Sequence, residues 1–510
     1  MEAQVAYLKK YRLPILLLFL IFLFGLYLRN LYLPDTLLFM WEQGRDLSVA
    51  KDIATLKKLS LIGPKTDVEG IFHGVFYYYF LALIYSVTRG NPASIISIFT
   101  IVNTLSVVVV YFIGKEVFRN KLYAYLSALL CAVSFNVIIY GRWLSNASFS
   151  IFVATLFFYT LTKLVKTKQP VWLVPTFFFV GLLSHFELLN LLDALFLTCI
   201  VVLLRRISLK NIYAFFAGAV FFFTITPFIL FDLRHQFILT KGLQRYFTES
   251  SNIPIPFALR LKLYMQGLFQ EFTNTLFPAD PNGAFILLIF MLLLFFATFN
   301  SLYRERKTLL SFLFICLFWT LPYIFLLKDK PLEQFYAGTA IPIILLFCFF
   351  LEASEKYLKK SVTVAVIFLV SAVNIFYTVN ALKNRNNIFY HSANKKLIYK
   401  DQLAALDYIF STASGPFIID AFTIPFFHTE GWNYLYLWSG ETKYPAVYRK
   451  SHAKRPQMIY LVIEPHKSYD INSPDVFWLN NWLKEQDKAS NIVQKKRIGN
   501  LEIQVRRIKS

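Results

Sequence analysis

The sequence has 510 residues, of which 57% are hydrophobic and only 16% charged. Soluble domains carry about 25% charged residues, and here apolar runs of about 20 residues, long enough to cross a bilayer as helices, recur through residues 13–380. This excludes a soluble enzyme, a DNA-binding protein and a disordered scaffold. The net charge of +22 does not indicate nucleic acid, because much of it lies in short clusters between the apolar runs.

Eleven apolar stretches are predicted to span the membrane: 13–33, 94–114, 122–140, 147–162, 171–187, 189–204, 211–231, 284–302, 308–327, 336–352 and 361–380. One more stretch, residues 75–87, has 13 residues. It would reach about 20 Å against a hydrocarbon core of about 30 Å, so we expect it to be interfacial or re-entrant.

The basic residues select an orientation for these spans. If 75–87 does not cross, six clusters of three positive residues share one side: Lys9/Lys10/Arg12, Lys115/Arg119/Lys121, Lys163/Lys166/Lys168, Arg205/Arg206/Lys210, Arg304/Arg306/Lys307 and Lys356/Lys359/Lys360. The positive-inside rule makes that side cytoplasmic. It predicts a multi-pass protein of the cell membrane with a cytoplasmic N-terminus and an extracytoplasmic C-terminal tail.

Three extracytoplasmic pieces follow, namely the loops 34–93 and 232–283 and the tail 383–510. The second loop contains an amphipathic segment at 257–272, expected to lie along the membrane surface. In the tail, 400–410 predicts a helix, and 416–420 and 457–464 predict buried strands. The chain is thus expected to comprise a transmembrane module at 1–382 and a small soluble α/β domain at 383–510.

Ionisable side chains gather at the outer ends of the spans, where burying them beside lipid is costly. Glu42 and Asp46 are four residues apart and so lie on one face of a helix. A carboxylate beside a lipid-exposed cleft suits a base that removes the proton of an acceptor hydroxyl as it attacks an anomeric carbon. Nearby cations would stabilise a leaving lipid phosphate.

Three segments of the first outer loop carry a family resemblance: Glu42-Gln43-Gly44-Arg45-Asp46, Leu61-Ile62-Gly63-Pro64 and Phe72-His73-Gly74-Val75-Phe76-Tyr77-Tyr78-Tyr79. They resemble the signature of the GT-C glycosyltransferases, in the branch of the dolichyl-phosphate-mannose-protein mannosyltransferases and the aminoarabinose transferases acting on lipid A. Architecture is similar over residues 13–380. Motifs are similar over 36–80 and at Phe231-Asp232-Leu233-Arg234-His235.

The resemblance implies a GT-C-like membrane fold with about 11 spans and juxtamembrane helices, and an inverting glycosyltransferase. Its donor would be a polyprenyl-phosphate-linked sugar, and its acceptor a lipid, a glycan or a protein. Glu42 takes the place of the family's acidic residue, often Asp in relatives, as general base, with Asp46 as the second candidate. Donor phosphate or substrate contacts are expected from His73, Arg142, Arg234, His235, Lys330, Tyr77 and Tyr78.

Structural alternatives stand beside these roles. Glu42 could be a solvated carboxylate, Asp46 could pair with a lysine, and His73 could cap a helix. Tyr77 and Tyr78 could anchor at the interface, and Arg142 could reach lipid headgroups. Arg234 and His235 could form an ion pair with Asp232, Lys330 could end its loop, and the segment from His428 to Trp432 could bind acceptor or form a turn.

This chemistry needs no nucleotide, and the sequence has no GxxxxGK[ST] phosphate loop. A divalent metal is possible, with His185 and Glu187 as a weak candidate pair. The rival function is a secondary transporter or flippase for a lipid-linked substrate, although transporters favour internal repeats and charges at mid-membrane. A third possibility is an inactive relative that only binds lipid-linked sugar.

Overall fold

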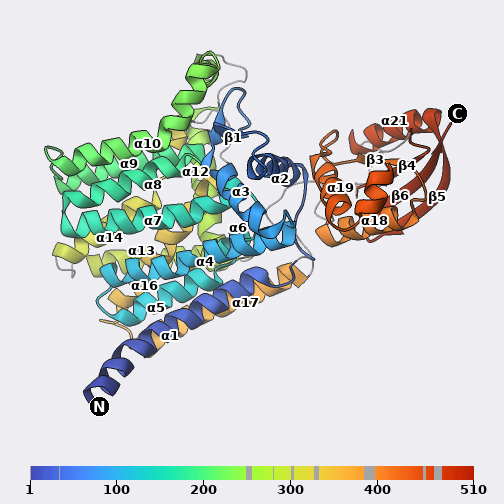
Figure 1. Ribbon diagram of the computed structural model, residues 1–510. Helices are drawn as coiled ribbons and strands as arrows, with labels where there is room; N and C mark the ends of the chain where they lie inside the picture. Colours follow the sequence, from blue (N-terminus) through green and yellow to red (C-terminus); the bar gives the residue numbers. More distant parts are fainter. Residues whose placement is uncertain are drawn as a thin grey trace.

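The computed structural model describes residues 2–33, 35–248, 255–278, 281–299, 304–326, 332–383, 397–451, 455–464 and 474–509. A bundle of long helices occupies one side of the molecule, and a smaller unit of helices and strands lies beyond one end of the bundle (Figure 1). The N-terminus lies at the opposite end of the bundle from this smaller unit. The two ends of the bundle are therefore distinct.

The bundle is built from helices that coincide with the predicted apolar stretches: α1 (Glu2–Asn30), α4 (Pro92–Val117), α5 (Lys121–Val133), α6 (Phe135–Gly141), α7 (Asn146–Thr167), α8 (Leu173–Leu183), α9 (Leu188–Arg205), α10 (Ile212–Arg234), α13 (Pro281–Phe299), α14 (Arg304–Leu317), α15 (Tyr323–Leu326), α16 (Ala340–Ser354) and α17 (Lys360–Lys383). Short 3-10 turns, Pro170–Trp172 and Glu333–Thr339, precede α8 and α16. Among the described residues, seven helices are long and apolar enough to cross a bilayer. The multi-pass character is confirmed, and the total of eleven spans stays a prediction.

One predicted span is bent where α5 meets α6. The two helices form a 55° angle, and counting them as one span gives an eighth. The N–H of Phe135, which the bend releases from the helix, donates to Asn374 Oδ1 of α17 at 2.9 Å. Ser134 Oγ donates to the carbonyl of Thr275 at 3.0 Å. The bend is thus satisfied by polar side chains, as a break within an apolar bundle requires.

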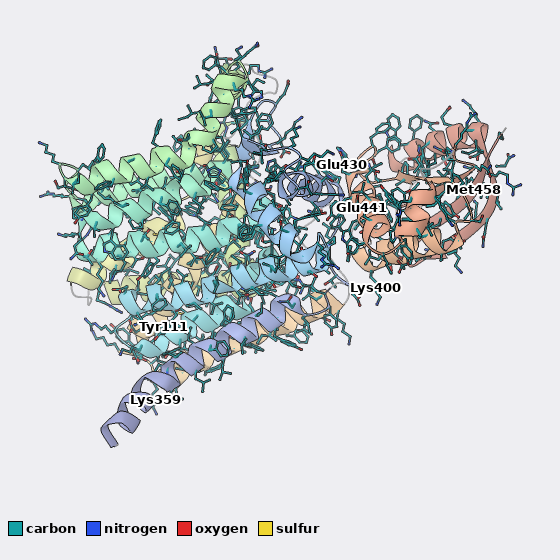
Figure 2. The ribbon with its side chains drawn as sticks, in the orientation of Figure 1. Tyr111, Lys359, Lys400, Glu430, Glu441 and Met458 are labelled. Carbon is teal, nitrogen blue, oxygen red and sulfur yellow. The ribbon has the colours of Figure 1, made fainter. Side chains whose placement is uncertain are left out.

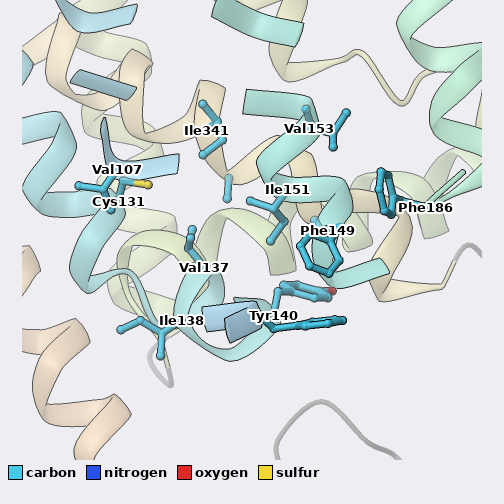
Figure 3. Packing of buried hydrophobic residues seen from close by; sticks show 14 of the residues in the cluster. Val107, Cys131, Val137, Ile138, Tyr140, Phe149, Ile151, Val153, Phe186 and Ile341 are labelled. Atoms are coloured by element: carbon cyan, nitrogen blue, oxygen red, sulfur yellow. The ribbon is translucent and has the colours of Figure 1, made fainter. Parts of the chain in front are cut away.

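The core of the bundle is apolar, and Figure 3 shows part of it, with Val107, Cys131 and Ile341 converging from α4, α5 and α16. At the end of the bundle nearer the smaller unit, the first outer loop folds into α2 (Trp41–Ala54), β1 (Ile62–Lys65), β2 (Phe72–Gly74) and α3 (Phe76–Thr88). Helix α3 is the short helix expected at 75–87. The second outer loop contains α11 (Ile238–Thr248) and α12 (Phe257–Leu276), and α12 includes the predicted amphipathic segment.

The tail contains α18 (Tyr399–Thr412), β3 (Phe417–Phe422), α19 (Glu430–Thr442), α20 (Pro445–Ser451), β4 (Met458–Ile463), α21 (Pro474–Ala489), β5 (Ser490–Ile498) and β6 (Leu501–Ile508). Its sheet has the order β3-β4-β6-β5, with β3 and β4 parallel and the other pairs antiparallel. The predicted helix and two strands are present as α18, β3 and β4. The tail faces the bundle through α19, which lies beside α2 (Figure 1).

Candidate active site

A cleft of about 350 Å³ opens between the first outer loop and the start of α9. Its polar wall comes from α2, from β1 and β2 and from the turn that joins them, and it includes Glu42, Arg45, Lys65, Asp67 and His73. Apolar side chains from α9, α11, α15 and the segment before α16 also line the cleft: Leu188, Leu189, Leu191, Leu192, Leu243, Phe247, Leu326, Leu332 and Phe335. Glu187, just before α9, and Gln334 add polar groups to this part of the lining. The cleft therefore suits a ligand with a polar head and an apolar chain.

Helix α2 is fixed at its first turn by Gln43. The N–H of Met40 donates to Gln43 Oε1 at 2.9 Å, and Gln43 Nε2 donates to the carbonyl of Leu144 at 3.0 Å. This satisfies one amide that a helix start leaves unpaired and ties α2 to the bundle. Leu47 and Ala50 are fully buried below, so the exposed side of the first turn, with Glu42, is directed into the cleft.

The two candidate bases have different surroundings. Asp46 is 2% exposed, does not line the cleft, and accepts hydrogen bonds from Arg45 Nε at 2.8 Å and from Tyr78 Oη at 3.1 Å. Glu42 lines the cleft, and its carboxylate has no such hydrogen-bond partner among the described residues. Burial, together with the negative charge of Asp46 and Asp67, raises the pKa of Glu42 to about 7, although Arg45 opposes the shift. Glu42 is therefore the better placed of the two to exchange a proton near neutral pH.

His73 also lines the cleft, with a neutral ring. Burial and the positive charge of Arg45 lower its pKa to about 4. The N–H of Leu188 donates to His73 Nδ1 at 3.3 Å, which leaves the proton on Nε2. His73 is thus equipped to donate a hydrogen bond to a ligand, whereas positive charge in the cleft comes from Arg45 and Lys65.

Glu187 lines the opposite side of the cleft and is 4% exposed. Burial raises its pKa to about 8, with the charge of Asp67 as a further cause and the backbone amides at the start of α9 opposing. Its neighbour His185 is engaged on both ring nitrogens: the N–H of Phe76 donates to Nδ1 at 3.3 Å, and Nε2 lies 2.8 Å from the carbonyl of Thr224. The pair therefore does not form a chelate, and the described part of the chain holds no cluster of three or more potential metal ligands.

The other predicted residues that the structure describes do not line the cleft. Arg142 donates to the carbonyls of Arg29 and Leu31 at 2.8 and 2.7 Å and to Thr36 Oγ1 at 2.6 Å, so it fastens the turn after α1. Tyr77 and Tyr78 are buried behind Asp46.

The charged residues at the end of α10, namely Asp232, Arg234 and His235, do not line the cleft either. Arg234 is exposed, and His235 stacks on Phe231 with ring centroids 4.1 Å apart. Asp232 accepts from the N–H of Leu239 at 2.7 Å and so caps α11 instead of pairing with Arg234. Lys330 lies outside the described residues.

Sequence reasoning quoted Arg45 in its motif without a role, considered Glu187 only as a metal ligand, and missed Lys65 and Asp67. Strands β1 and β2 pair antiparallel, with Lys65 opposite Phe72, and both Lys65 and His73 line the cleft. The sequence offered one signal for Lys65 and Asp67: they are charged residues close to the end of a short strand that precedes the His-Gly motif. Glu187 meets this group only through the tertiary fold.

Known proteins resemble the chain in sequence over one segment and in fold throughout. Residues 72–231 match the family model of the dolichyl-phosphate-mannose-protein mannosyltransferases. The crystal structure of ArnT from Cupriavidus metallidurans bound to undecaprenyl phosphate is similar with a TM-score of 0.57 and 10% identity, covering 96% of this chain and 97% of ArnT. ArnT in the apo state gives a TM-score of 0.54 and 12% identity, covering 99% and 98%. No curated protein matches by sequence.

The fold and the matched segment define the class: the chain is a multi-pass membrane protein with the GT-C glycosyltransferase fold. Within that class it resembles the branch of the protein mannosyltransferases and ArnT, as the first outer loop predicted. The matched segment starts at Phe72 and includes His73 and Arg142, but it ends before the tail and does not reach back to Glu42.

Proposed function

We propose that the protein transfers a sugar from a polyprenyl-phosphate donor to an acceptor hydroxyl on the extracytoplasmic face, with inversion at the anomeric carbon and Glu42 as general base. The observation that carries the proposal is the Glu42 carboxylate: it has no hydrogen-bond partner among the described residues, burial raises its pKa to about 7, and it lies in a cleft lined by both charged and apolar side chains. ArnT, with the same fold, binds undecaprenyl phosphate.

The proposed reaction moves one proton and exchanges one bond. Glu42 takes the proton of the acceptor hydroxyl, whose oxygen attacks the anomeric carbon from the side opposite the phosphate. The bond between the anomeric carbon and the phosphate oxygen breaks, and the polyprenyl phosphate leaves with the bonding electrons. Arg45 and Lys65 line the same cleft and would stabilise the negative charge that develops on the phosphate. The leucines of α9 would hold the first isoprene units.

The placement of the basic clusters supports an extracytoplasmic cleft. Lys163 and Lys166 pair with Glu116 at 3.0 and 3.1 Å, Arg205 Nε donates to the carbonyl of Val165, and Arg306 Nη1 donates to that of Val117. Four of the clusters thus meet at the C-terminal end of α4. The other end of α4 contacts the tail, because Tyr434 Oη donates to the carbonyl of Gly90 at 2.6 Å. By the positive-inside rule the tail and the cleft face outward.

The test is sugar transfer in proteoliposomes with a panel of radiolabelled polyprenyl-phosphate sugars and a membrane extract as acceptor source. Glu42→Gln is expected to lose roughly 10²- to 10⁴-fold in turnover, the usual range for removing a general base, while its folding and donor binding remain. Asp52→Asn is the matched control, because Asp52 belongs to the same helix and pairs only with the exposed Lys57 at 3.7 Å among described residues. If Asp46→Asn lost turnover to this extent and Glu42→Gln lost none, the role of general base would belong to Asp46. Full activity in both variants would exclude the mechanism.

A further inference from the structure

The tail and α2 approach each other backbone to backbone. A Cβ on Gly44 of α2 would overlap the backbone of Glu430 and Gly431 at the start of α19. Reciprocally, a Cβ on Gly431 would lie 2.8 Å from the carbonyl oxygen of Met40. Only glycine permits so close an approach at both positions, so this seam has no room for any side chain.

Contacts at both ends of α2 flank the glycine seam. At the first turn, the Trp41 ring lies against His428 with centroids 4.6 Å apart. At the last turn, Lys51 Nζ lies 2.6 Å from Glu441 Oε2. Figure 2 shows Glu430 and Glu441 on the side of the tail that faces α2. The tail therefore holds α2 along its whole length and not at a single point.

The tail is itself fixed to the bundle beside α2. Gln402 Nε2 donates to the carbonyl of Phe39 at 3.0 Å, and Trp438 Nε1 donates to that of Arg89 at 3.1 Å. Phe39, just before α2, lies between the rings of Tyr399 and Tyr434, with centroids 5.8 Å from each. These contacts fix the position of α19 where it packs against α2.

The seam and the cleft lie on opposite faces of α2. At about 100° per residue, Gly44 and Lys51 point roughly 180–200° away from Glu42, whereas Arg45 and Asp46 lie within about 60° of it. Helix α2 is thus a single layer, with the tail on one face and the cleft on the other. Because α2 lies between the two, a shift of α19 toward or away from the bundle would change how far the Glu42 side chain enters the cleft.

We propose that the tail is part of the catalytic apparatus, and that Gly44 and Gly431 are positioning residues that set the location of Glu42 relative to the reacting atoms. The proposal rests on the proposed function of Glu42 as base. Misplacement of a reacting group by about 1 Å costs roughly 100-fold in rate, and one added methyl group at the seam is of that size.

The experiment compares Gly44→Ala and Gly431→Ala with Gly218→Ala and Gly415→Ala, whose added methyl groups meet nothing within 4 Å. Gly44 and Gly218 both lie within helices, so both substitutions gain the same helix propensity. The seam variants are expected to lose roughly 10- to 100-fold in kcat with the donor KM within about twofold, and the controls are expected to match wild type. His428→Ala, which introduces no overlap, is expected to lower kcat several-fold and covers the case in which a seam variant fails to fold.

A second readout does not depend on transfer. Carbodiimide modifies protonated carboxyl groups, and mass spectrometry of the full-length protein between about pH 5 and pH 9 follows the modification of Glu42. The midpoint in Gly44→Ala or His428→Ala is expected to move by at least about half a pH unit from that of wild type, because the environment that sets the ionisation of Glu42 changes. Gly218→Ala is expected to keep the wild-type midpoint.

The two readouts separate this proposal from the proposed function. Wild-type kcat and an unmoved midpoint in folded seam variants and in His428→Ala would overturn the positioning role, whatever Glu42 does. If the midpoint of Glu42 modification moved in the seam variants but Glu42→Gln was fully active, Glu42 would not be the general base. The influence of the tail on the surroundings of Glu42 through α2 would still stand. Equal losses of kcat in Gly44→Ala and Gly218→Ala would show a general helix effect and also overturn the proposal.

Discussion

The buried carboxylate of Glu352, at one end of the bundle, and the carboxyl groups of Glu42 and Glu187, in the cleft at the other end, differ in their partners. At the end away from the tail, Arg306 and Glu352 are 6% and 8% exposed and form an ion pair, which is completed by a hydrogen bond from the N–H of Asn120 to Glu352 Oε1 at 2.7 Å. At the tail end, Glu42 and Glu187 line a cleft without an ion pair within 4 Å among described residues. A buried charge that supports the fold is paired. Carboxyl groups with perturbed pKa values in a cleft are candidates for chemistry.

Removing one partner of the Arg306–Glu352 ion pair gives the largest expected loss of stability. Arg306→Met leaves Glu352 buried without its cation, and we expect the free energy of unfolding to fall by about 3–5 kcal/mol. Thermal unfolding in detergent measures this loss, and activity per folded molecule should stay at the wild-type level. The double variant Arg306→Met/Glu352→Met removes both charges and should recover wild-type stability. A stable Arg306→Met protein without activity would break the distinction between the two ends.

Arg142 sharpens the comparison, because it is a buried cation at the tail end whose hydrogen bonds go to uncharged acceptors. Arg142→Lys loses the geometry that joins the carbonyls of Arg29 and Leu31 to Thr36. We expect a loss of about 1.5–3 kcal/mol in stability, the range for a hydrogen bond to a charged group, and an unchanged donor KM. Arg234→Lys is the control, since Arg234 is exposed. A tenfold higher donor KM with unchanged stability would instead give Arg142 the donor contact that the family resemblance implied.

Whole elements were predictable where the signal is local. The apolar stretches, α3, α12, α18, β3 and β4 follow from runs of similar residues. The β5–β6 hairpin was missed because β5 is almost wholly exposed and carries Gln494, Lys495, Lys496 and Arg497 in succession, a pattern without an apolar face. Within the cleft, only Glu42 and His73 were predictable, because each belongs to a short motif of the first outer loop.

Other members of the site depend on tertiary structure. Glu187 belongs to the cleft because the start of α9 lies opposite α2, and Arg142 leaves it because the turn after α1 offers carbonyl groups. No sequence pattern encodes either neighbour. The close contact of Gly44 with Gly431 likewise joins residues almost four hundred positions apart.

The pH dependence of sugar transfer tests the role of Glu42 directly. A base must be deprotonated to act, and the pKa of Glu42 is raised from 4.5 to about 7. We therefore expect kcat/KM to rise about tenfold per pH unit below pH 7 and to level off above it. Asp67→Asn removes a negative charge that helps to raise this pKa, so its rising limb should move to lower pH. A flat profile between about pH 5 and pH 7 would remove Glu42 from the role.

The smallest effect on activity is expected at Glu187. With a pKa of about 8, its carboxyl group is protonated at pH 7, and the amide of Glu187→Gln replaces it with a neutral group of similar shape. Transfer at pH 7 should change by less than about threefold, or roughly 0.7 kcal/mol. Stability should respond more: because the folded pKa lies above the unfolded value near 4.5, the wild type loses stability as pH rises from that value toward 8, and the variant does not. The difference in Tm between variant and wild type should therefore be larger at pH 9 than at pH 6. A hundredfold loss of transfer at pH 7 would show instead that the Glu187 proton takes part in the reaction, and the cleft would then hold two working carboxyl groups.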